Sequence, residues 1–154
     1  MPESIKPNED FTKEMVLFLK SHHVFTLATV SDNRPWCAQC FYVYVPEWKA
    51  LVFSSDSDTK HALEFVENPC VAASVLLETE TIGKIQGVQM EGVVEKPEGG
   101  NLSEASRFYL KRFPYAVLIK TTMWVLRLTS VKMTDNRFGF GKKQYWSASQ
   151  PYKL

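Results

Sequence analysis

The chain has 154 residues and a mass of 17.7 kDa, which is long enough for one domain with a substantial core and short for two. Its 18 Lys and Arg against 17 Asp and Glu leave a formal charge of +1, so we expect neither nucleic acid nor an acidic membrane as a partner. The 45% hydrophobic and 13% aromatic content excludes disorder and indicates a well-filled, β-rich interior.

Cysteine usage and hydropathy indicate the cellular compartment. No run of about 18 apolar residues occurs, which excludes a transmembrane helix. Residues 1–10 are polar, lack the apolar core of a signal peptide and are expected to form a flexible tail before a single domain over 11–154. Three cysteines without dense spacing do not suit a secreted disulfide scaffold. We therefore expect a cytoplasmic protein.

The first part of the chain changes from helical periodicity to short β-branched and aromatic runs separated by turn residues. In chain order we expect a helix over about 11–22 capped by Asp10, a strand over 24–30, a turn at 32–35, a strand over 36–45, a turn at 46–49 and a strand over 50–54.

The rest of the chain continues this alternation of short helices and strands. We expect a helix over about 59–67, with Asp58 as its N-cap and Asn68-Pro69 as its end, followed by strands over 70–77 and 82–96. A helix over 103–113, ended by Pro114, comes next. The last two strands are expected over 123–133 and 137–146, joined by a turn at 134–136. Interior glycines at 83, 87 and 92 indicate bends or bulges in a curved sheet.

About seven strands and three short helices, with strands mostly adjacent in sequence, favour a mainly β fold with flanking helices: an antiparallel barrel with helices packed outside. The strand over 36–45 is apolar on both faces. One face fills the barrel, and the other needs a cover: a helix, a second subunit or the flat face of a cofactor.

Two patterns that resemble metal or redox sites are better explained by packing. Cys37 and Cys40 have the spacing of a redox or zinc pair, but on a strand they point to opposite faces, about 10 Å apart. His22 and His23 suit the C-terminal end of the first helix, where a cation is favourable. Motifs of zinc proteases, nucleotide triphosphatases, α/β-hydrolases and Rossmann folds are absent. We expect no metal site.

The segment 54–61 is a candidate phosphate-binding cradle. Hydroxyl side chains end a strand and lead into a helix start, where free N–H groups and the helix dipole favour an anion. Thr59 supplies a hydroxyl, Lys60 a full positive charge and His61 a second donor. The local sequence by itself favours a simpler interpretation, a capped helix with solvated polar residues.

Two further groups of polar residues are candidates for ligand contact. Lys142 and Lys143 follow a glycine-flanked segment, where a ligand can approach closely or lysines protect an edge strand. Gln86 and Gln89 lie on opposite faces of one strand, so that one of them is placed to hydrogen-bond a heterocycle or solvent.

Taken together, these segments resemble the FMN-binding split-barrel superfamily, whose best-known member is pyridoxamine 5′-phosphate oxidase. The resemblance spans about residues 24–146 and rests on the strand and helix start at 51–55 and 59–62, on Asn68-Pro69, and on the bent strand at 88–95. Gly87-Val88-Gln89, Arg112-Phe113-Pro114 and the segments 134–136 and 139–143 are similar, more narrowly, to a small uncharacterised bacterial branch of that superfamily.

The resemblance implies a six-stranded antiparallel split β-barrel that works as a homodimer with FMN at the subunit interface. The family's phosphate-binding pair maps to Lys60 and His61, with Thr59 in the serine position. The remaining implied cofactor contacts are Gln39, Cys40, Ser54 and Ser55 from the strands, Gln86 or Gln89 facing the ring, and added charge from Lys142 and Lys143.

Departures from the family pattern argue against pyridoxamine phosphate oxidation itself. The arginine that opens the flavin strand is replaced near Ala38, His61 stands where lysine is frequent, and the carboxy-terminal substrate segment has no counterpart. The first functional hypothesis is therefore an FMN-dependent oxidoreductase acting on an unidentified small molecule. The alternative is a non-catalytic haem- or flavin-binding module, with His22, His23 or His61 as axial ligand. A third possibility is a dimer with a vestigial pocket.

Overall fold

The computed structural model describes residues 10–149, so the predicted tail lies outside the described residues except for Asp10. The helices and strands are α1 (Lys13–Ser21), β1 (Val24–Ser31), β2 (Arg34–Val45), β3 (Ala50–Ser55), α2 (Lys60–Glu67), β4 (Cys70–Leu76), β5 (Gln86–Glu95), α3 (Gly99–Arg112), β6 (Thr122–Asp135) and β7 (Lys143–Ser147). Short 3-10 turns occupy Pro46–Trp48, Ile82–Lys84, Pro114–Leu118 and Asn136–Phe138.

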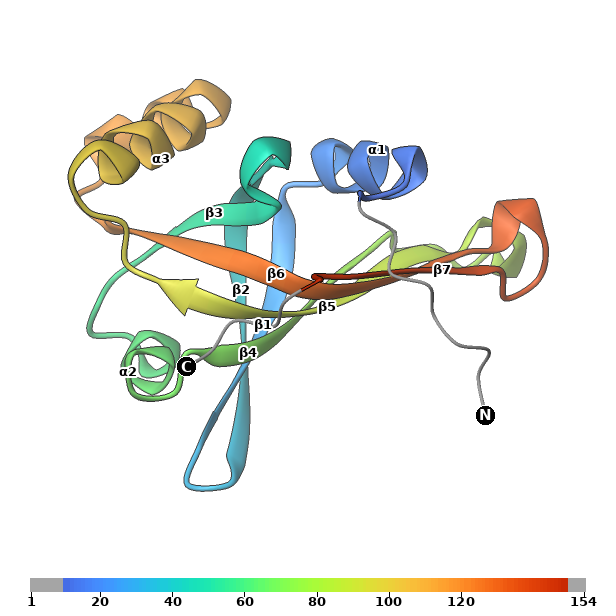
Figure 1. Cartoon of the computed structure of the whole chain (residues 1–154), viewed down its shortest axis with the longest axis horizontal. Helices are drawn as coiled ribbons and strands as arrows, with labels where there is room; N and C mark the ends of the chain where they lie inside the picture. Colours follow the sequence, from blue (N-terminus) through green and yellow to red (C-terminus); the bar gives the residue numbers. More distant parts are fainter. Residues whose placement is uncertain (1–9, 150–154) are drawn as a thin grey trace.

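The strands form one antiparallel sheet in the order β3-β2-β1-β4-β5-β6-β7, and an additional pairing between β3 and β6 closes the first six into a barrel. The seventh strand extends the sheet beside β6. Figure 1 shows α1 and α3 on one side of this sheet and α2 near the β1–β2 hairpin. The predicted split β-barrel with outside helices is confirmed.

The barrel closes because β6 serves two neighbours along one edge. Residues 122–127 of β6 pair with β3, and residues 130–134 pair with β7. Between these stretches the register with β5 shifts at Glu91 and Gly92 and skips Thr129. A Cβ atom on Gly92 would lie 2.3 Å from the carbonyl oxygen of Arg127, so only glycine permits this approach. The predicted bend in the long strand is therefore found at Gly92.

Two apolar clusters hold the helices in place. The main core fills the barrel, and α1 contributes Met15, Phe18 and Leu19 to it. The second cluster, which includes Val52, Ala105 and Tyr109, packs α3 against the outer side of β3. This helix supplies part of the predicted cover for the apolar strands. Trp36 and Phe41 of β2 nevertheless remain 46% and 53% exposed.

Both predicted N-caps are displaced. The Thr12 hydroxyl caps α1 by accepting from Met15 N, while Asp10 forms an ion pair with Lys49 at 3.1 Å. The Thr59 hydroxyl caps α2 by accepting from Ala62 N, and Asp58 precedes the cap. Threonine and aspartate are both good N-cap residues, so the residue type alone does not show which of two nearby positions begins the helix.

Several predicted boundaries also shift because of local backbone geometry. The first hairpin turns on two residues with positive φ, Asp32 and Asn33, which leaves the next two residues inside β2. Positive φ at Gly139 and Gly141 keeps their loop out of β7, contrary to the predicted strand over 137–146. The strand predicted from residue 82 begins at 86 after a 3-10 turn, and α3 begins at Gly99, ahead of the predicted 103.

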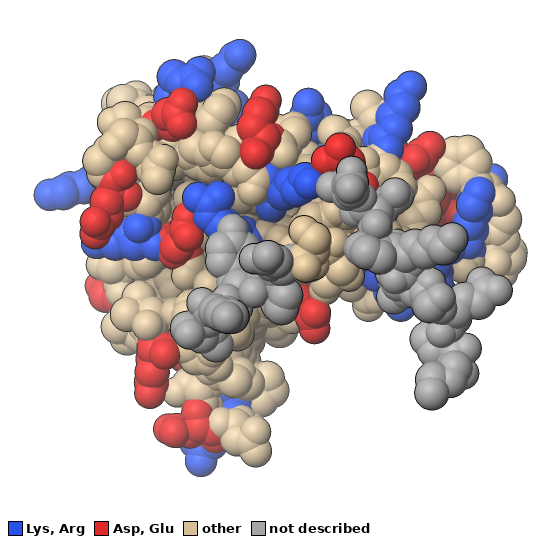
Figure 2. Space-filling model, viewed as in Figure 1, with Lys and Arg blue, Asp and Glu red and all other residues tan. Residues whose placement is uncertain are grey.

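Charged side chains of both signs are interspersed on the face shown in Figure 2, as the near-zero net charge predicts. No helix within residues 10–149 is both long enough and apolar enough to span a membrane.

We expect Gly92→Ala to destabilise the barrel by about 2 kcal/mol, because the new methyl group meets the backbone carbonyl of Arg127, which cannot move aside as a side chain can, in addition to the Leu126 side chain. The measurement is urea unfolding followed by far-UV circular dichroism. Gly83→Ala is the control, since nothing lies within 4 Å of the methyl group it adds, and it should change the unfolding free energy by less than about 0.5 kcal/mol. Equal effects of the two substitutions would contradict the role given to Gly92.

Candidate functional site

Three of the predicted site residues converge where β3 leads into α2. The Ser55 hydroxyl lies 2.5 Å from Nε2 of His61, and the Thr59 hydroxyl lies 3.2 Å from the same nitrogen and 3.4 Å from the Ser55 oxygen. Thr59 also donates to the Asp56 carbonyl at 2.9 Å, which fixes its side chain at the helix start. Ser55, Thr59 and His61 thus form a compact group of polar atoms, here called the cradle.

The imidazole of the cradle is half-buried and uncharged at neutral pH. Burial lowers the pKa of His61 below its usual value, and the nearby Glu64 carboxylate offsets only part of this effect. A neutral imidazole has one donor and one acceptor nitrogen, so Nε2 either accepts from Ser55 or donates to a hydroxyl, according to the tautomer.

Lys60 lies beside the cradle but is engaged by a buried carboxylate. Its ammonium pairs with Glu64 and lies 5.1 Å from the ring centroid of Trp36. The other oxygen of Glu64 accepts from the buried Thr29 hydroxyl at 2.5 Å. Hydrogen bonds from Lys60 and then Thr29 are the main reasons that the pKa of Glu64 is lowered. This carboxylate therefore stays ionised and cancels much of the charge of Lys60.

Sequence reasoning missed Glu64 and Thr29. The spacing of Lys60 and Glu64, four residues apart on one helix, signals an ion pair. Nothing in the local sequence signals Thr29, because it reaches the site through its pairing with Trp36 across the β1–β2 hairpin.

Ser54 faces a different part of the molecule from Ser55. Its hydroxyl donates to the Tyr109 hydroxyl of α3 at 2.9 Å. Burial raises the pKa of Tyr109, so this phenol remains neutral. The backbone carbonyl of Ser55 accepts from the indole of Trp124 at 3.0 Å, which fixes the end of β3. Only Ser55 of the serine pair therefore joins the cradle.

The β2 candidates divide between the two faces of the sheet. Cys40 is 6% exposed in the barrel core, where burial raises the pKa of its thiol to about 11. Gln39 is exposed on the outer face, as is Cys37, which confirms that the two cysteines point to opposite faces. A flavin contact at position 40 stays a prediction, and in this conformation only its main chain is available for one.

The remaining candidates lie away from the cradle. Gln86 is partly buried at the start of β5, whereas Gln89 is exposed on the outer face, as predicted for opposite faces of one strand. Lys142 and Lys143 are exposed at the connection from β6 to β7, at the end of the molecule remote from α2 in Figure 1. Within one chain, these two lysines do not join the cradle.

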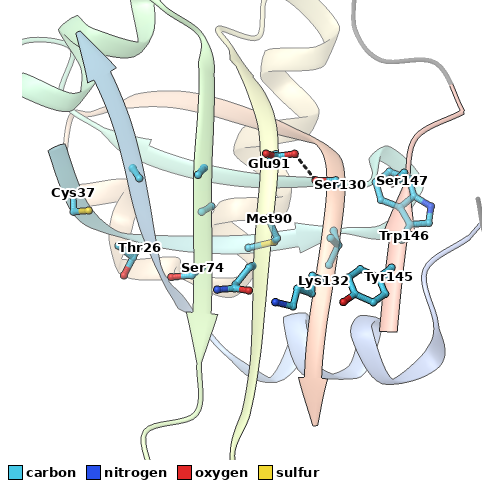
Figure 3. A pocket seen from close by; sticks show the side chains of 15 residues that line it. Thr26, Cys37, Ser74, Met90, Glu91, Ser130, Lys132, Tyr145, Trp146 and Ser147 are labelled. Atoms are coloured by element: carbon cyan, nitrogen blue, oxygen red, sulfur yellow. Dashed lines mark hydrogen bonds between the residues drawn. The ribbon is translucent and has the colours of Figure 1, made fainter. Parts of the chain in front are cut away.

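A second candidate site is a groove of about 590 Å³ across the outer face of β1, β4, β5, β6 and β7. Strand pairing aligns its side chains in two rows. The first row is Thr26, Ser74, Gln89, Lys132 and Tyr145, and the second is Ala28, Ala72, Glu91, Ser130 and Ser147. Figure 3 shows Ser74, Lys132 and Tyr145 at one level and Glu91 with Ser130 at the next. Of these residues, sequence reasoning identified only Gln89.

Comparison with known proteins identifies the family. The model of the family described as pyridoxamine 5′-phosphate oxidase matches residues 11–135. The chain belongs to the pyridoxamine 5′-phosphate oxidase family. It is 38% identical over 134 residues to a UPF0306 protein of Yersinia pestis, covering 87% of this chain and 91% of that one. A UPF0306 protein of Photorhabdus laumondii is 39% identical over 129 residues, covering 84% and 90%. Both relatives are bacterial, as the narrower resemblance implied.

Solved structures of the family's fold include proteins described as binding different cofactors. A haem-binding protein from Mycobacterium smegmatis superposes with a TM-score of 0.77 at 22% identity, covering 93% of this chain and 59% of that protein. An FAD-binding protein from Mesorhizobium loti gives 0.67 at 16% identity, covering 80% and 94%. An FAD-binding protein from Mycobacterium smegmatis gives 0.64 at 18% identity, covering 90% and 98%. Because the sequence identities are 22% or lower, the similarity to these structures shows a shared fold and nothing about the ligand.

The ion pair at α2 leads to a prediction about acid stability. Because the pKa of Glu64 is lowered on folding, its ionised form stabilises the protein above the unfolded-state pKa, and this contribution disappears as the pH falls through the folded-state value. Glu64→Gln should therefore be less stable than the native chain at neutral pH, and the two should converge in acid. The measurement is urea unfolding at several pH values. A constant difference across the acid range would contradict the assignment.

Proposed function

We propose that this protein binds FMN, with the phosphate held at the cradle and by Lys60. The observation that carries the proposal is the convergence of the Ser55 and Thr59 hydroxyls with the His61 imidazole at the start of α2. The Ser55 hydroxyl, the His61 imidazole and the Lys60 ammonium are suitable donors to phosphate oxygens, and Thr59 positions them at the start of the helix, so the donor set fits the group.

The position of the cradle adds to its suitability for an anion. The first N–H groups of α2 have no acceptor within the helix, and the helix dipole places partial positive charge there. Lys60 contributes less than a free cation would, because Glu64 shares its ammonium. We therefore infer that hydroxyl and imidazole hydrogen bonds carry a large part of phosphate binding.

We further propose a homodimer with FMN at the subunit interface. Trp36 is 46% exposed, which is unusual for a large apolar residue unless another surface covers it. Trp36 also contacts Lys60, so an interface at β2 would lie beside the phosphate site. The family assignment and the FAD-binding neighbours support a flavin as the ligand.

In this proposal the protein is an oxidoreductase for a small molecule. Bound FMN supplies the electron or hydride transfer, and the protein supplies binding, orientation and exclusion of water. Pyridoxamine phosphate is not the substrate that we propose, since a histidine stands at position 61, where the family pattern frequently has lysine. The exposed free thiols of Cys37 and Cys70 favour a reducing, cytoplasmic location.

A non-catalytic haem-binding module is the second candidate, favoured by the haem-binding neighbour with a TM-score of 0.77. Of the three histidines, His23 is exposed and stacks on Phe41, while Nδ1 of His22 lies 2.9 Å from the Phe18 carbonyl. His61 is partly buried and its Nε2 contacts both cradle hydroxyls, whereas His23 is exposed, so His23 is the more accessible ligand. An absorption spectrum of the purified protein separates the candidates, because haem gives a Soret band and flavin does not.

We expect Lys60→Ala to weaken FMN binding about tenfold, because a charge-assisted phosphate contact is lost. Glu64→Gln is a matched control, since it breaks the same ion pair but leaves the cation, and it should keep or increase the affinity. The measurements are quenching of FMN fluorescence on titration and the thermal midpoint of each variant without ligand.

Two outcomes of that experiment count against the proposal. If the native chain neither binds FMN nor shows a thermal shift with it, the proposed function is wrong. If both variants lose affinity equally and in proportion to their loss of stability, Lys60 is structural and the phosphate site lies elsewhere.

His61 should make FMN binding depend on pH. Its lowered pKa leaves it neutral in the free protein, and a phosphate beside the ring would raise that pKa. The complex would then hold more protons than the free protein, so affinity should rise as the pH falls from about 8 to about 6. His61→Gln should show a shallower rise, and since FMN titrates identically with both proteins, the ratio of affinities isolates the histidine. Parallel pH profiles would contradict this role.

A further inference from the structure

The negative charge beside the cradle is buried and permanent at neutral pH. Glu64 is 6% exposed, and its two carboxylate oxygens accept from the Lys60 ammonium and from the Thr29 hydroxyl, which is itself buried. These hydrogen bonds, that of Lys60 before that of Thr29, lower the pKa of Glu64 and keep it ionised. Because water is largely excluded around this carboxylate, salt screens its charge far less than that of a surface acid.

A phosphate bound to Lys60 lies within the field of this carboxylate. Charge-assisted hydrogen bonds are about 2.8 Å long, so a phosphate oxygen on the other side of the ammonium is at most about 6 Å from Glu64. At that separation every negative charge on the phosphate is repelled. The cradle does not offset this repulsion with a charge of its own, because Ser55, Thr59 and the His61 imidazole are neutral. The attraction comes from Lys60 and from the start of α2.

Two opposing energies depend differently on the charge of the phosphate. Its attraction to Lys60 and to the helix start rises in proportion to that charge. The cost of removing the group from water rises more steeply, as the square of the charge in the Born description of ion solvation. A strong positive field therefore favours a doubly charged phosphate, and a weak one favours a singly charged phosphate. By cancelling much of the charge of Lys60, Glu64 places this site in the weak-field case.

We propose that Glu64 is a specificity-determining residue that makes the phosphate site select a singly charged phosphate over a doubly charged one. Ligands of the preferred class are phosphodiesters and phosphomonoesters that retain one proton. Glu64 does not contact the ligand and acts through its field and through Lys60. This inference rests on the proposed phosphate site at the cradle and Lys60, and adds to it the charge of the group that is bound there.

The test uses three flavins that share one ring system and differ in charge. At about pH 8 riboflavin has no phosphate charge, riboflavin cyclic phosphate has one and FMN has two, since the second pKa of a phosphomonoester is about 6. Binding is followed by quenching of flavin fluorescence. The native chain should bind the cyclic phosphate at least about threefold more tightly than FMN, and riboflavin most weakly.

Glu64→Gln should change these affinities in the order of ligand charge. The substitution removes the carboxylate charge and keeps an oxygen that can accept from Thr29. It should strengthen FMN binding about tenfold and cyclic phosphate binding about threefold, and leave riboflavin unchanged, because the repulsion removed is proportional to the charge of the ligand. The fold-change for FMN should thus be about the square of that for the cyclic phosphate.

Glu67→Gln is the matched control, because it removes a negative charge from the same helix at an exposed position. Position 67 lies about 10 Å along the helix axis from Lys60, which exceeds the screening length of about 8 Å at physiological ionic strength. All three affinities should stay within about twofold of the native values. Far-UV circular dichroism and the thermal midpoint of each variant establish that it is folded.

Tighter native binding of FMN than of the cyclic phosphate would overturn the inference, and this comparison decides the question even if Glu64→Gln does not fold. An equal fold-change for all three flavins in Glu64→Gln would also overturn it, because Glu64 would then act through the fold. In either case the proposed function stands as long as both phosphorylated flavins bind more tightly than riboflavin. Equal native affinity for all three flavins would refute the phosphate site together with this inference, and a native chain that binds none of them would refute the proposed function as well.

Discussion

The close approach of Gly92 to the backbone of Arg127 is the constraint on which the rest of the structure depends. It allows β6 to leave β3 and continue along β7 without losing its pairing with β5. On one side of the crossing, Ser55 pairs with Thr122, and this pairing fixes the end of β3 and hence the start of α2. On the other side, Lys132 pairs with Tyr145. One backbone contact therefore positions both the cradle and the cationic row of the groove.

The charge distribution around α2 explains why the cradle relies on neutral groups. A carboxylate as buried as Glu64 is costly to keep ionised without partners, and Lys60 and Thr29 provide them. The same interactions reduce the positive field that Lys60 offers to a ligand. With His61 held neutral by its burial, the site presents hydroxyl and imidazole donors together with one shared cation. As the proposed phosphate site, it would bind more weakly and more specifically than a cluster of free lysines, because hydrogen-bond geometry rather than net charge would govern binding.

The features predicted correctly from the sequence depend on residues close together in the chain. The alternating strands, the turn after β1, the end of α2 at Asn68-Pro69 and the hydroxyls beside His61 all follow from local patterns. The predicted helix start was wrong where two neighbouring residues are about equally good N-caps, as Asp58 and Thr59 are for α2. A bend at Gly92 could be predicted from the sequence, but its close approach to the Arg127 backbone could not, because Arg127 lies on another strand.

The row that contains Lys132 illustrates the remaining limit. Gln89, Lys132 and Tyr145 become neighbours only through the register of three strands, and a shift of one residue would send each of them to the opposite face. An exposed sheet face with small apolar residues is a favourable surface for contact with another molecule. Among residues 10–149 no carboxylate forms an ion pair with Lys132, so covering its ammonium costs free energy unless the partner, whether a ligand or a second chain, brings an acceptor. Any surface or ligand that covers this face would therefore have to satisfy the Lys132 ammonium as well as make apolar contacts.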